Sequence, residues 1–303
     1  MIALWGLPGD EPLDRVREEL AATGRDSVLL DQRDADRMRW DDGARHARVL
    51  HTGHAHVALD AVRALYTRVY DLHQIPALEG TDAQAMNAIE RVQSTLWAWA
   101  DRAPALVLNR PTAMASNSSK PYQAMLIERH GFAVPETLVT TDVDAVLAFH
   151  ERHGEVIYKS VSGVRSMVSR LCVDDRARLD DIVWCPTQFQ ALVPGTDHRV
   201  HVVGDRVFTV RIDSDAVDYR YAAAQGASLA LHAAVLEPDV QDAAVRLAHA
   251  LGLPLAGIDL RRTPEGEWVC FEVNPSPCFT YYENLTGLPI ARAVADLLAA
   301  GYQ

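Results

Sequence analysis

Lysine is the scarcest charged residue in this 303-residue sequence, which contains two of them, Lys120 and Lys159. Basic residues as a whole are outnumbered: 29 lysines and arginines face 41 aspartates and glutamates, which gives a formal net charge of -12. A nonspecific grip on nucleic-acid phosphates or anionic lipid would have to overcome this repulsion. The charge balance therefore argues against nucleic acid and membrane surfaces as partners, and it leaves room for a local basic pocket.

The sequence also has few cysteines, and it lacks long apolar runs and one nucleotide-binding signature. The four cysteines form no Cys-x-x-Cys pair and match no zinc spacing. No apolar run approaches the roughly 18 residues of a membrane span, and the first residues carry no basic leader, so we expect a cytoplasmic protein. The absence of Gly-x-x-x-x-Gly-Lys-Ser/Thr excludes a P-loop as the source of nucleotide binding.

The patterning that is present indicates several α/β units. Residues 1 to about 112 alternate short apolar runs with helical stretches such as Asp82–Ala100, which is typical of a small α/β layer domain. Beyond Gly163 we expect strands to dominate, with hairpins at Val203–Arg206 and Thr263–Gly266. The last predicted element is a helix over Ile290–Ala300.

Three oxygen-bearing side chains stand in two apolar stretches near the C-terminus: Asp259, Glu272 and Asn274. Alternate residues of a strand face the same way, so Glu272 and Asn274 share a side, and an antiparallel partner can bring Asp259 beside them. Hard oxygen donors suit Mg2+ that is held partly by nucleotide phosphates. A solvated polar strand face is the alternative, but the apolar flanks favour a metal site because a buried carboxylate needs a partner.

Both lysines stand at the ends of predicted elements. Lys120 begins a helix, and Lys159 ends an apolar strand that runs into Ser162 and Gly163. A half-buried lysine is costly unless it meets an anion, and a glycine-containing loop lets backbone N–H groups approach phosphate oxygens. The pattern predicts phosphate binding, with a lysine that merely extends its amine to solvent as the alternative.

Arginines form a third cluster, in which Arg199 and Arg211 lie on neighbouring strands of a predicted hairpin and Arg220 follows in the chain. Their guanidinium groups can face one charged centre and stabilise negative charge on a transferred group. Surface pairing with the many acidic residues is the competing interpretation.

Taken in order, these motifs resemble the landmarks of the ATP-grasp family. The segments that carry the resemblance are Lys120-Pro-Tyr-Gln, Val156-Ile-Tyr-Lys159, Phe189-Gln190-x-x-Val193, Asp197-x-Arg199, Asp218-Tyr-Arg220, Gly257-Ile-Asp259-Leu and Phe271-Glu272-Val-Asn274-Pro275. The sequence is most similar to the RimK-type branch and, within it, to the microviridin-type peptide ligases, also called graspetide synthetases. The resemblance is strong over about residues 105–300 and weak before them.

The resemblance implies an α/β (α+β) chain with the ATP-grasp fold. An N-terminal pre-ATP-grasp α/β domain (residues 1–112) would precede a central (113–187) and a C-terminal (188–303) ATP-grasp subdomain, and the two subdomains would clasp ATP. The implied activity is that of an ADP-forming carboxylate-amine or carboxylate-hydroxyl ligase that acts through an acyl phosphate.

The same resemblance assigns roles to individual residues. The residues implied to bind ATP are Lys120, Lys159, Ser162, Gly163, Gln190, Ala191, Leu192, Val193 and Asp197. Asp259, Glu272 and Asn274 would hold Mg2+, as two ions, and Arg199, Arg211 and Arg220 would steady the acyl phosphate.

One departure bears on the substrate. Peptide ligases of this branch usually carry Asn-Pro-Asn-Gly-Gln-Trp after the metal strand, whereas this chain has Asn274-Pro-Ser-Pro-Cys-Phe279. A ribosomal peptide and a single amino acid are therefore both open as the carboxylate that is joined to an amine or hydroxyl nucleophile. An ATP-grasp phosphotransferase and a nucleotide-binding module without turnover are further alternatives. The sequence does not decide the oligomeric state, and a homodimer is one possibility.

Overall fold

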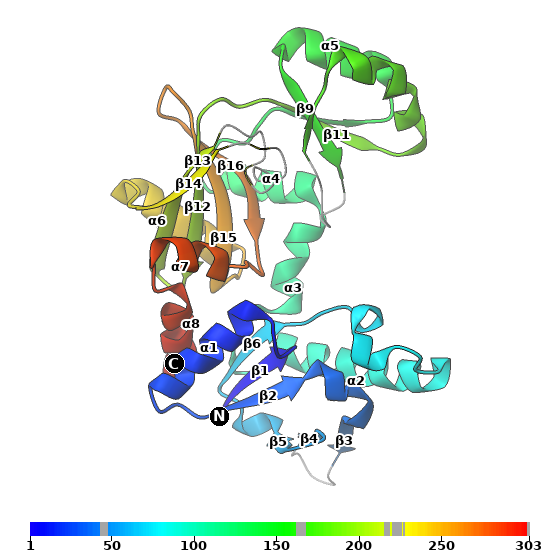
Figure 1. Ribbon diagram of the computed structural model, residues 1–303, viewed down its shortest axis with the longest axis vertical. Coiled ribbons are helices and arrows are strands. Elements are labelled where there is room, and N and C mark those ends of the chain that lie inside the picture. Colours follow the sequence, from blue (N-terminus) through cyan, green and yellow to red (C-terminus); the bar gives the residue numbers. More distant parts are fainter. Residues whose placement is uncertain (43–47, 162–167, 215–218, 220–225, 227, 302–303) are drawn as a thin grey trace.

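The computed structural model describes residues 1–42, 48–161, 168–214, 219, 226 and 228–301. Three parts, each built on its own main sheet, follow one another along the long axis of the molecule (Figure 1). The N-terminal part lies at one end, the central part lies at the other, and the C-terminal sheet lies between them. No helix in the described ranges combines the length and the apolar character needed to cross a membrane.

The N-terminal part contains a parallel four-stranded sheet in the order β2-β1-β6-β7. Its main elements are β1 (Ile2–Gly6), α1 (Glu11–Ala22), β2 (Ser27–Asp31), β6 (Ala64–Arg68), α2 (Ala83–Arg102) and β7 (Leu106–Leu108). All five residues of β1 are buried, as expected for a parallel strand that is covered on both faces. A small antiparallel sheet of β3 (Arg39–Asp42), β4 (Arg48–His51) and β5 (His56–Ala58) adjoins this part.

The central part follows α3 (Pro111–Met114) and α4 (Lys120–Arg129), and it has an antiparallel sheet in the order β10-β9-β11-β8. Its elements are β8 (Thr137–Thr140), α5 (Val143–His153), β9 (Val156–Ser160), β10 (Ser169–Arg170), the 3-10 segment η6 (Val173–Trp184) and β11 (Thr187–Ala191). The expectation that strands dominate beyond Gly163 is wrong for η6. Leu179 and Ile182, three residues apart, both turn into the core of this part, which is helical spacing.

The C-terminal part is an antiparallel five-stranded sheet in the order β14-β13-β12-β15-β16, followed by two helices. Its elements are β12 (Thr196–Val203), β13 (Arg206–Ser214), β14 (Leu229–Ala234), α6 (Pro238–Ala250), β15 (Leu255–Arg262), β16 (Trp268–Asn274), α7 (Thr280–Thr286) and α8 (Ile290–Ala300). Both predicted hairpins and the predicted helix over Ile290–Ala300 are confirmed.

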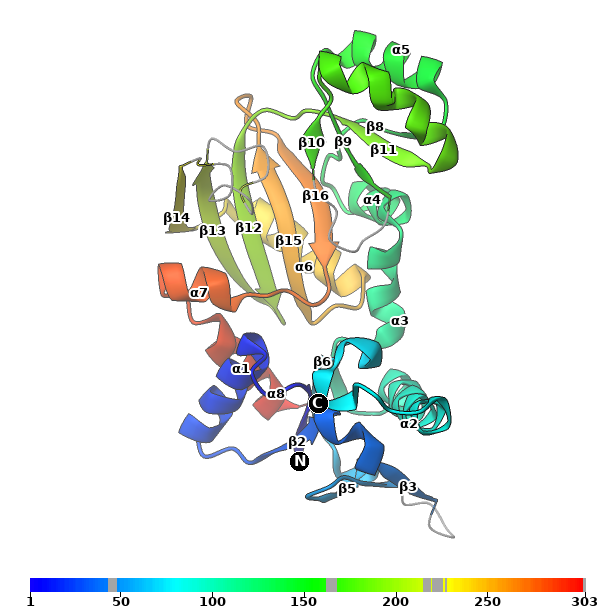
Figure 2. The ribbon, with the colours of Figure 1, turned by 45° about the vertical axis from the view of Figure 1, so that its right-hand side comes forward.

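The two faces of the C-terminal sheet have different surroundings. Val200, Val202 and Ile258 form a core with α6, which covers one face. Alternation along β12 therefore sends Arg199 to the opposite face. The central part lies beside one end of β16 (Figure 2). Any site formed between the two sheets is thus built from the residues that α6 does not cover.

The last helix, α8, returns to the N-terminal part and packs beside α1. Val294 and Leu298 of α8 share one hydrophobic core with Leu4 and Val16, and Val203 of β12 joins the same core. The C-terminal and N-terminal sheets are therefore connected through a common apolar interior.

Candidate functional site

A cleft opens between the central sheet and the face of the C-terminal sheet that α6 leaves uncovered. Its lining residues are Ile157, Lys159, Val168, Gln190, Leu192 and Val193 from the central side, and Asp197, Tyr219, Asp259, Arg261, Phe271 and Glu272 from the C-terminal side. Seven of the residues predicted from the sequence meet here. Two walls with different chemistry face one another across this space.

The central wall takes its geometry from the pairing of β9 with β11. Gln190 pairs with Ile157, and Lys159 lies two residues further along the same face of β9. The Lys159 ammonium donates a hydrogen bond to Gln190 Oε1 at 3.3 Å, and Gln190 Nε2 donates to Thr137 Oγ1 at 2.9 Å. This wall therefore offers one cation and one fixed amide beside apolar side chains. Ala191 differs from its neighbours, because its side chain packs against the core of the central part.

The C-terminal wall presents acidic side chains in register. Asp259 of β15 pairs with Glu272 of β16, so their side chains leave the same face of the sheet. Asn274 pairs with Gly257, two residues along that face. The predicted approach of Asp259 to Glu272 is confirmed, while metal binding by these residues stays a prediction.

Arg199 lies beside these acids and is buried, with 5% of its surface exposed. Its Nη1 donates to Asp259 Oδ1 at 2.6 Å, and its guanidinium lies over the Tyr282 ring at 5.7 Å from the centroid. Burial lowers the pKa of Arg199, but the charge and hydrogen bond of Asp259, together with Tyr282 and Tyr219, outweigh that effect and the pKa rises, so the group stays cationic. A Cβ at Gly257 would overlap the guanidinium, which explains the glycine at that position.

Arg211 does not join Arg199, and the prediction that the two face one charged centre is wrong. The tight hairpin pairs Arg211 with His198 and Arg199 with Val210, so the two guanidinium groups leave opposite faces of the sheet. Arg211 instead donates to the half-exposed carboxylate of Asp213 at 2.8 Å.

Four other predicted residues lie away from the cleft lining or outside the described ranges. Lys120 is the first residue of α4, after the helix cap Ser119, and it is not among the side chains that line the cleft. Ser162, Gly163 and Arg220 lie outside the described residues.

Arg261, which was not predicted from the sequence, holds one end of the cleft together. Its Nε and Nη2 donate to the two carboxylate oxygens of Asp197 at 2.8 and 2.9 Å, and its Nη1 donates to the Val193 carbonyl at 2.7 Å. The guanidinium also lies over the Phe271 ring. Both oxygens of Asp197 therefore accept from Arg261, which also binds the segment between the two sheets through the Val193 carbonyl. The signal was available, because Arg261 follows Asp259 by two residues and shares its strand face.

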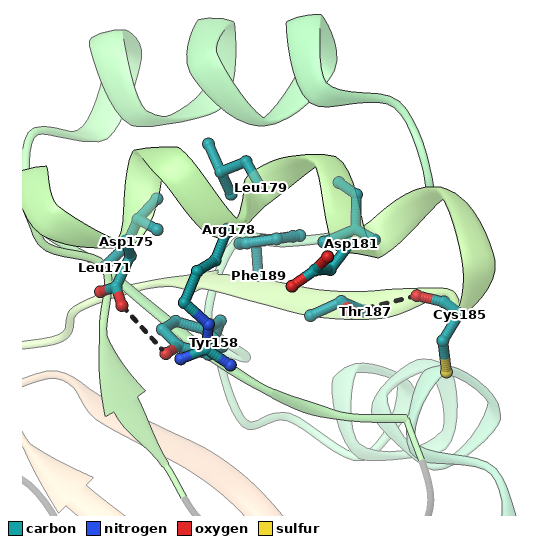
Figure 3. A pocket seen from close by; sticks show the side chains of 10 residues that line it. Tyr158, Leu171, Asp175, Arg178, Leu179, Asp181, Cys185, Thr187 and Phe189 are labelled. Atoms are coloured by element: carbon teal, nitrogen blue, oxygen red, sulfur yellow. Dashed lines mark hydrogen bonds between the residues drawn. The ribbon is translucent and has the colours of Figure 1, made fainter.

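A second cavity lies on the other face of the central sheet, under η6 (Figure 3). Tyr158 and Phe189 line it, and they alternate with the cleft residues Ile157 and Gln190 along β9 and β11. The Tyr158 hydroxyl donates to Asp175 Oδ1 at 3.5 Å at its rim. Its lining is mostly apolar, and the acids predicted to hold a metal ion are not part of it.

Comparison with known proteins assigns the family. The family model described as "RimK-like ATP-grasp domain" matches residues 117–298, and the chain belongs to this family.

Relatives and solved structures agree with this assignment. A "Probable alpha-L-glutamate ligase" of Pseudomonas aeruginosa PAO1 is 26% identical over 268 residues, which cover 81% of this chain and 87% of that protein. One of the same name from Rhodopirellula baltica is 28% identical over 204 residues, and the match spans about half (49%) of its length. The ATP-grasp ligase PsnB, complexed with a phosphomimetic variant of a minimal precursor, Mg and ADP, superimposes with a TM-score of 0.83 at 28% identity, covering 100% of this chain and 98% of that one.

The macrocyclase MdnC from Microcystis aeruginosa, bound to the precursor peptide MdnA, has the same fold. Its TM-score is 0.83 at 20% identity, with 99% of both chains covered. This likeness concerns the fold, and it agrees with the family model and with the PsnB structure.

Proposed function

We propose that this protein is an ADP-forming ligase that activates a carboxylate as an acyl phosphate and joins it to an amine or hydroxyl. One observation carries the proposal: the cleft holds Lys159 and Gln190 on one wall and Asp259 and Glu272 on the other. A cation for phosphate oxygens opposite carboxylates for a divalent ion is what a magnesium nucleotide requires.

The donor set fits Mg2+. The atoms of Asp259, Glu272 and Asn274 that can bind a metal ion are all oxygens, and they leave one face of two paired strands. No group of three His, Cys, Asp or Glu suited to a metal ion occurs in the described part of the chain, so the third protein ligand would be the amide of Asn274. Mg2+ accepts such a set because it usually keeps waters and substrate phosphates as its remaining ligands. When bound, Mg2+ would neutralise phosphate charge; use of two ions belongs to this proposal.

The other residues of the cleft orient the nucleotide and the substrate. Ile157, Leu192 and Val193 supply apolar contacts of the kind an adenine ring needs, and Gln190 supplies polar atoms beside them. Lys159 would bind phosphate oxygens, with Lys120, Ser162 and Gly163 as further phosphate ligands.

Two arginines would steady the acyl phosphate. Arg199, held by Asp259 and permanently charged, stabilises the negative charge that develops on the transferred group. Arg220 is proposed as the second cation, whereas Arg211 is not retained in this role because it leaves the other face of the sheet.

A peptide is the proposed carboxylate substrate. PsnB is described as complexed with its precursor, and it aligns with this chain from end to end at 28% identity. The second candidate is an amino-acid ligase, which is favoured by the relatives named as glutamate ligases and by the divergent loop at Asn274–Phe279.

ADP release with MgATP, measured separately with a peptide fraction and a low-mass fraction of a host extract, tests the activity. We expect acceptor-dependent ADP formation, and loss of one water's mass from a peptide would mark a peptide-modifying ligase. Glu272→Gln and Lys159→Ala should each reduce the rate at least about a hundredfold. Lys159 would neutralise phosphate charge directly, and the Glu272 carboxylate would hold the Mg2+ that does so. Glu265→Gln, on an exposed hairpin turn, is the control and should keep the wild-type rate. AMP in place of ADP, or near-native rates in either variant, would contradict the proposal.

A further inference from the structure

The loop that follows β16 is held by two side chains of the N-terminal part. Arg68 Nη1 donates to the Ser276 carbonyl at 3.0 Å and to the Ser276 hydroxyl at 2.9 Å, across 208 sequence positions. Asn109 Nδ2 donates to the carbonyl of Pro275 at 2.6 Å. This loop begins immediately after Asn274, the third oxygen donor of the proposed metal site.

Arg68 is itself fixed by a buried ion pair. Its Nε and Nη2 donate to the two oxygens of Asp10 at 3.0 and 2.9 Å, and the Tyr70 hydroxyl donates to the same carboxylate at 2.6 Å. The side chains of Arg68 and Asp10 are 10% and 2% exposed. Burial raises the pKa of Asp10, but the hydrogen bonds and charge of Arg68, with the hydrogen bonds from Tyr70 and Leu13, outweigh this, and the pKa falls below its ordinary value. The pair is therefore charged at neutral pH and geometrically rigid.

All three guanidinium nitrogens of Arg68 are engaged by Asp10 or by the loop. A substrate carboxylate would have to compete with these partners, two of which are held in a bidentate arrangement. Arg68 is therefore suited to hold protein structure in place and poorly suited to bind substrate.

The loop transmits this restraint to Asn274. The Ser276 N–H donates to Asn274 Oδ1 at 2.9 Å, which fixes the direction of the amide. An amide oxygen has two lone pairs, so the second remains available to a metal ion. A continuous series of hydrogen bonds thus runs from Asp10 through Arg68 and Ser276 to Asn274.

We propose that Arg68, held by Asp10, is a positioning residue for the metal end of the cleft: it anchors Ser276 and thereby holds the Asn274 oxygen toward the Mg2+ of the bound nucleotide. The inference rests on the proposed function, because Asn274 is a metal ligand only within it. It makes the N-terminal part a determinant of metal affinity.

Calorimetric titration of ADP into the full-length protein, with and without MgCl2, tests the inference without measuring turnover. Mg2+ should raise the ADP affinity of the wild type by some factor, and in Arg68→Met this factor should be about tenfold smaller. A tenfold loss is the usual cost of removing a residue that orients a metal ligand. Metal-free ADP affinity should stay within the error of the wild type. Arg33→Met is the matched control: Arg33 makes a similar pair with Asp31 at the end of β2, but it is 53% exposed and its guanidinium donates to Asp31, with no bond to the loop among the described residues. It should bind MgADP like the wild type.

Coupling to Asn274 separates positioning from a general structural role. In an Asn274→Ala background, Arg68→Met should cause no further loss of MgADP affinity, because the group it positions is gone. Additive losses, or full Mg2+ enhancement in Arg68→Met alone, would overturn the inference. If Arg68→Met fails to fold, Ser276→Ala keeps the Arg68–Asp10 pair intact and should lose roughly threefold of the enhancement; an unchanged enhancement would overturn it equally. A wild-type protein whose ADP affinity does not respond to Mg2+ would contradict the proposed function instead.

Discussion

His201 is fully buried on the face of β12 that also carries Arg199, two residues before it. Its ring lies 5.2 Å from that of Tyr282, and neither ring nitrogen has a hydrogen-bond partner among the described residues. Burial and the charge of Arg199 hold the pKa of His201 well below its ordinary value of 6.5. The histidine is therefore neutral in the folded protein, and the unfolded chain takes up the proton first as the pH falls.

This difference predicts how stability depends on pH. Because the folded-state pKa is lowered, His201 costs no stability above the unfolded value of about 6.5 and costs roughly 1.4 kcal/mol per pH unit below it. His201→Leu removes the titration without stranding a partner. Urea unfolding should be measured from pH 7.5 to 5.5. As the pH falls below 6.5, the free energy of unfolding of the variant should rise relative to that of the wild type. Parallel stability curves for the two proteins would contradict this expectation.

For single residues, the sequence predicted which side chains share a strand face, because the two-residue period of a strand specifies this locally. Glu272 and Asn274 share a strand face because they are two residues apart, and that prediction needed no tertiary information. Arg211 was misplaced because the face of a residue across a hairpin depends on a register that shifts with a single residue. Arg68 was not identified because its partner Ser276 lies 208 positions away.

Among the elements, β16 is the strand at the edge of its sheet, and its outer edge is closed by side-chain and loop contacts. Gln123 of α4 donates to the Val273 carbonyl at 2.8 Å and accepts from the Val273 N–H at 2.9 Å, as a neighbouring strand would. The Cys270 N–H donates to the Ala133 carbonyl at 2.8 Å. Closing an edge in this way removes the unpaired groups that invite other strands, and it fixes the strand that carries Glu272.

Gln123→Leu should be strongly destabilising, because it leaves the buried N–H and C=O of Val273 without partners. We expect a loss of about 2–3 kcal/mol in the free energy of unfolding, measured by urea titration. Gln84→Leu, on the exposed first turn of α2, should change it by less than about 0.5 kcal/mol. Equal effects of the two substitutions would show that Gln123 does not support the edge of β16.

Element types followed from the sequence where periodicity was strong, as in the helix over Ile290–Ala300. The 3-10 segment η6 was not predicted because half of its twelve residues are charged and they interrupt its apolar residues at short intervals. The role of Gln123 could not be predicted, since a polar residue inside an amphipathic helix normally indicates a solvent-facing position.

For the whole molecule, α8 makes the N-terminal and C-terminal sheets share one interior. Leu298 and Val294 contact the core that contains Leu4 of β1 and Leu255 of β15. The family resemblance predicted the fold over about residues 105–300, but it did not predict where α8 packs. An apolar helix such as α8 can pack against either sheet, and its sequence alone does not show which one. Contacts between distant parts of the chain decide.

Leu298→Ala tests this connection. Truncating a fully buried leucine should cost about 2–5 kcal/mol, and the loss should reach both sheets because the core is common to them. In native-state hydrogen exchange we expect the protection of β1 and β15 to fall together, while β9 and β11 keep theirs. Leu147→Ala, on the partly exposed face of α5, is the control and should leave β1 and β15 unchanged. Loss confined to β1 would show that the two sheets unfold independently.

Lys159 gives the cleft an unusual chemical property. The 303 residues contain only one other lysine, Lys120, and the N-terminal ammonium donates to the Ala61 carbonyl at 3.0 Å. Acylation by an amine-selective reagent therefore reaches very few positions, and one of them lies on the wall of the cleft. Peptide mapping of that single adduct gives a footprint of cleft occupancy in the unmodified protein, with no introduced tag or probe residue.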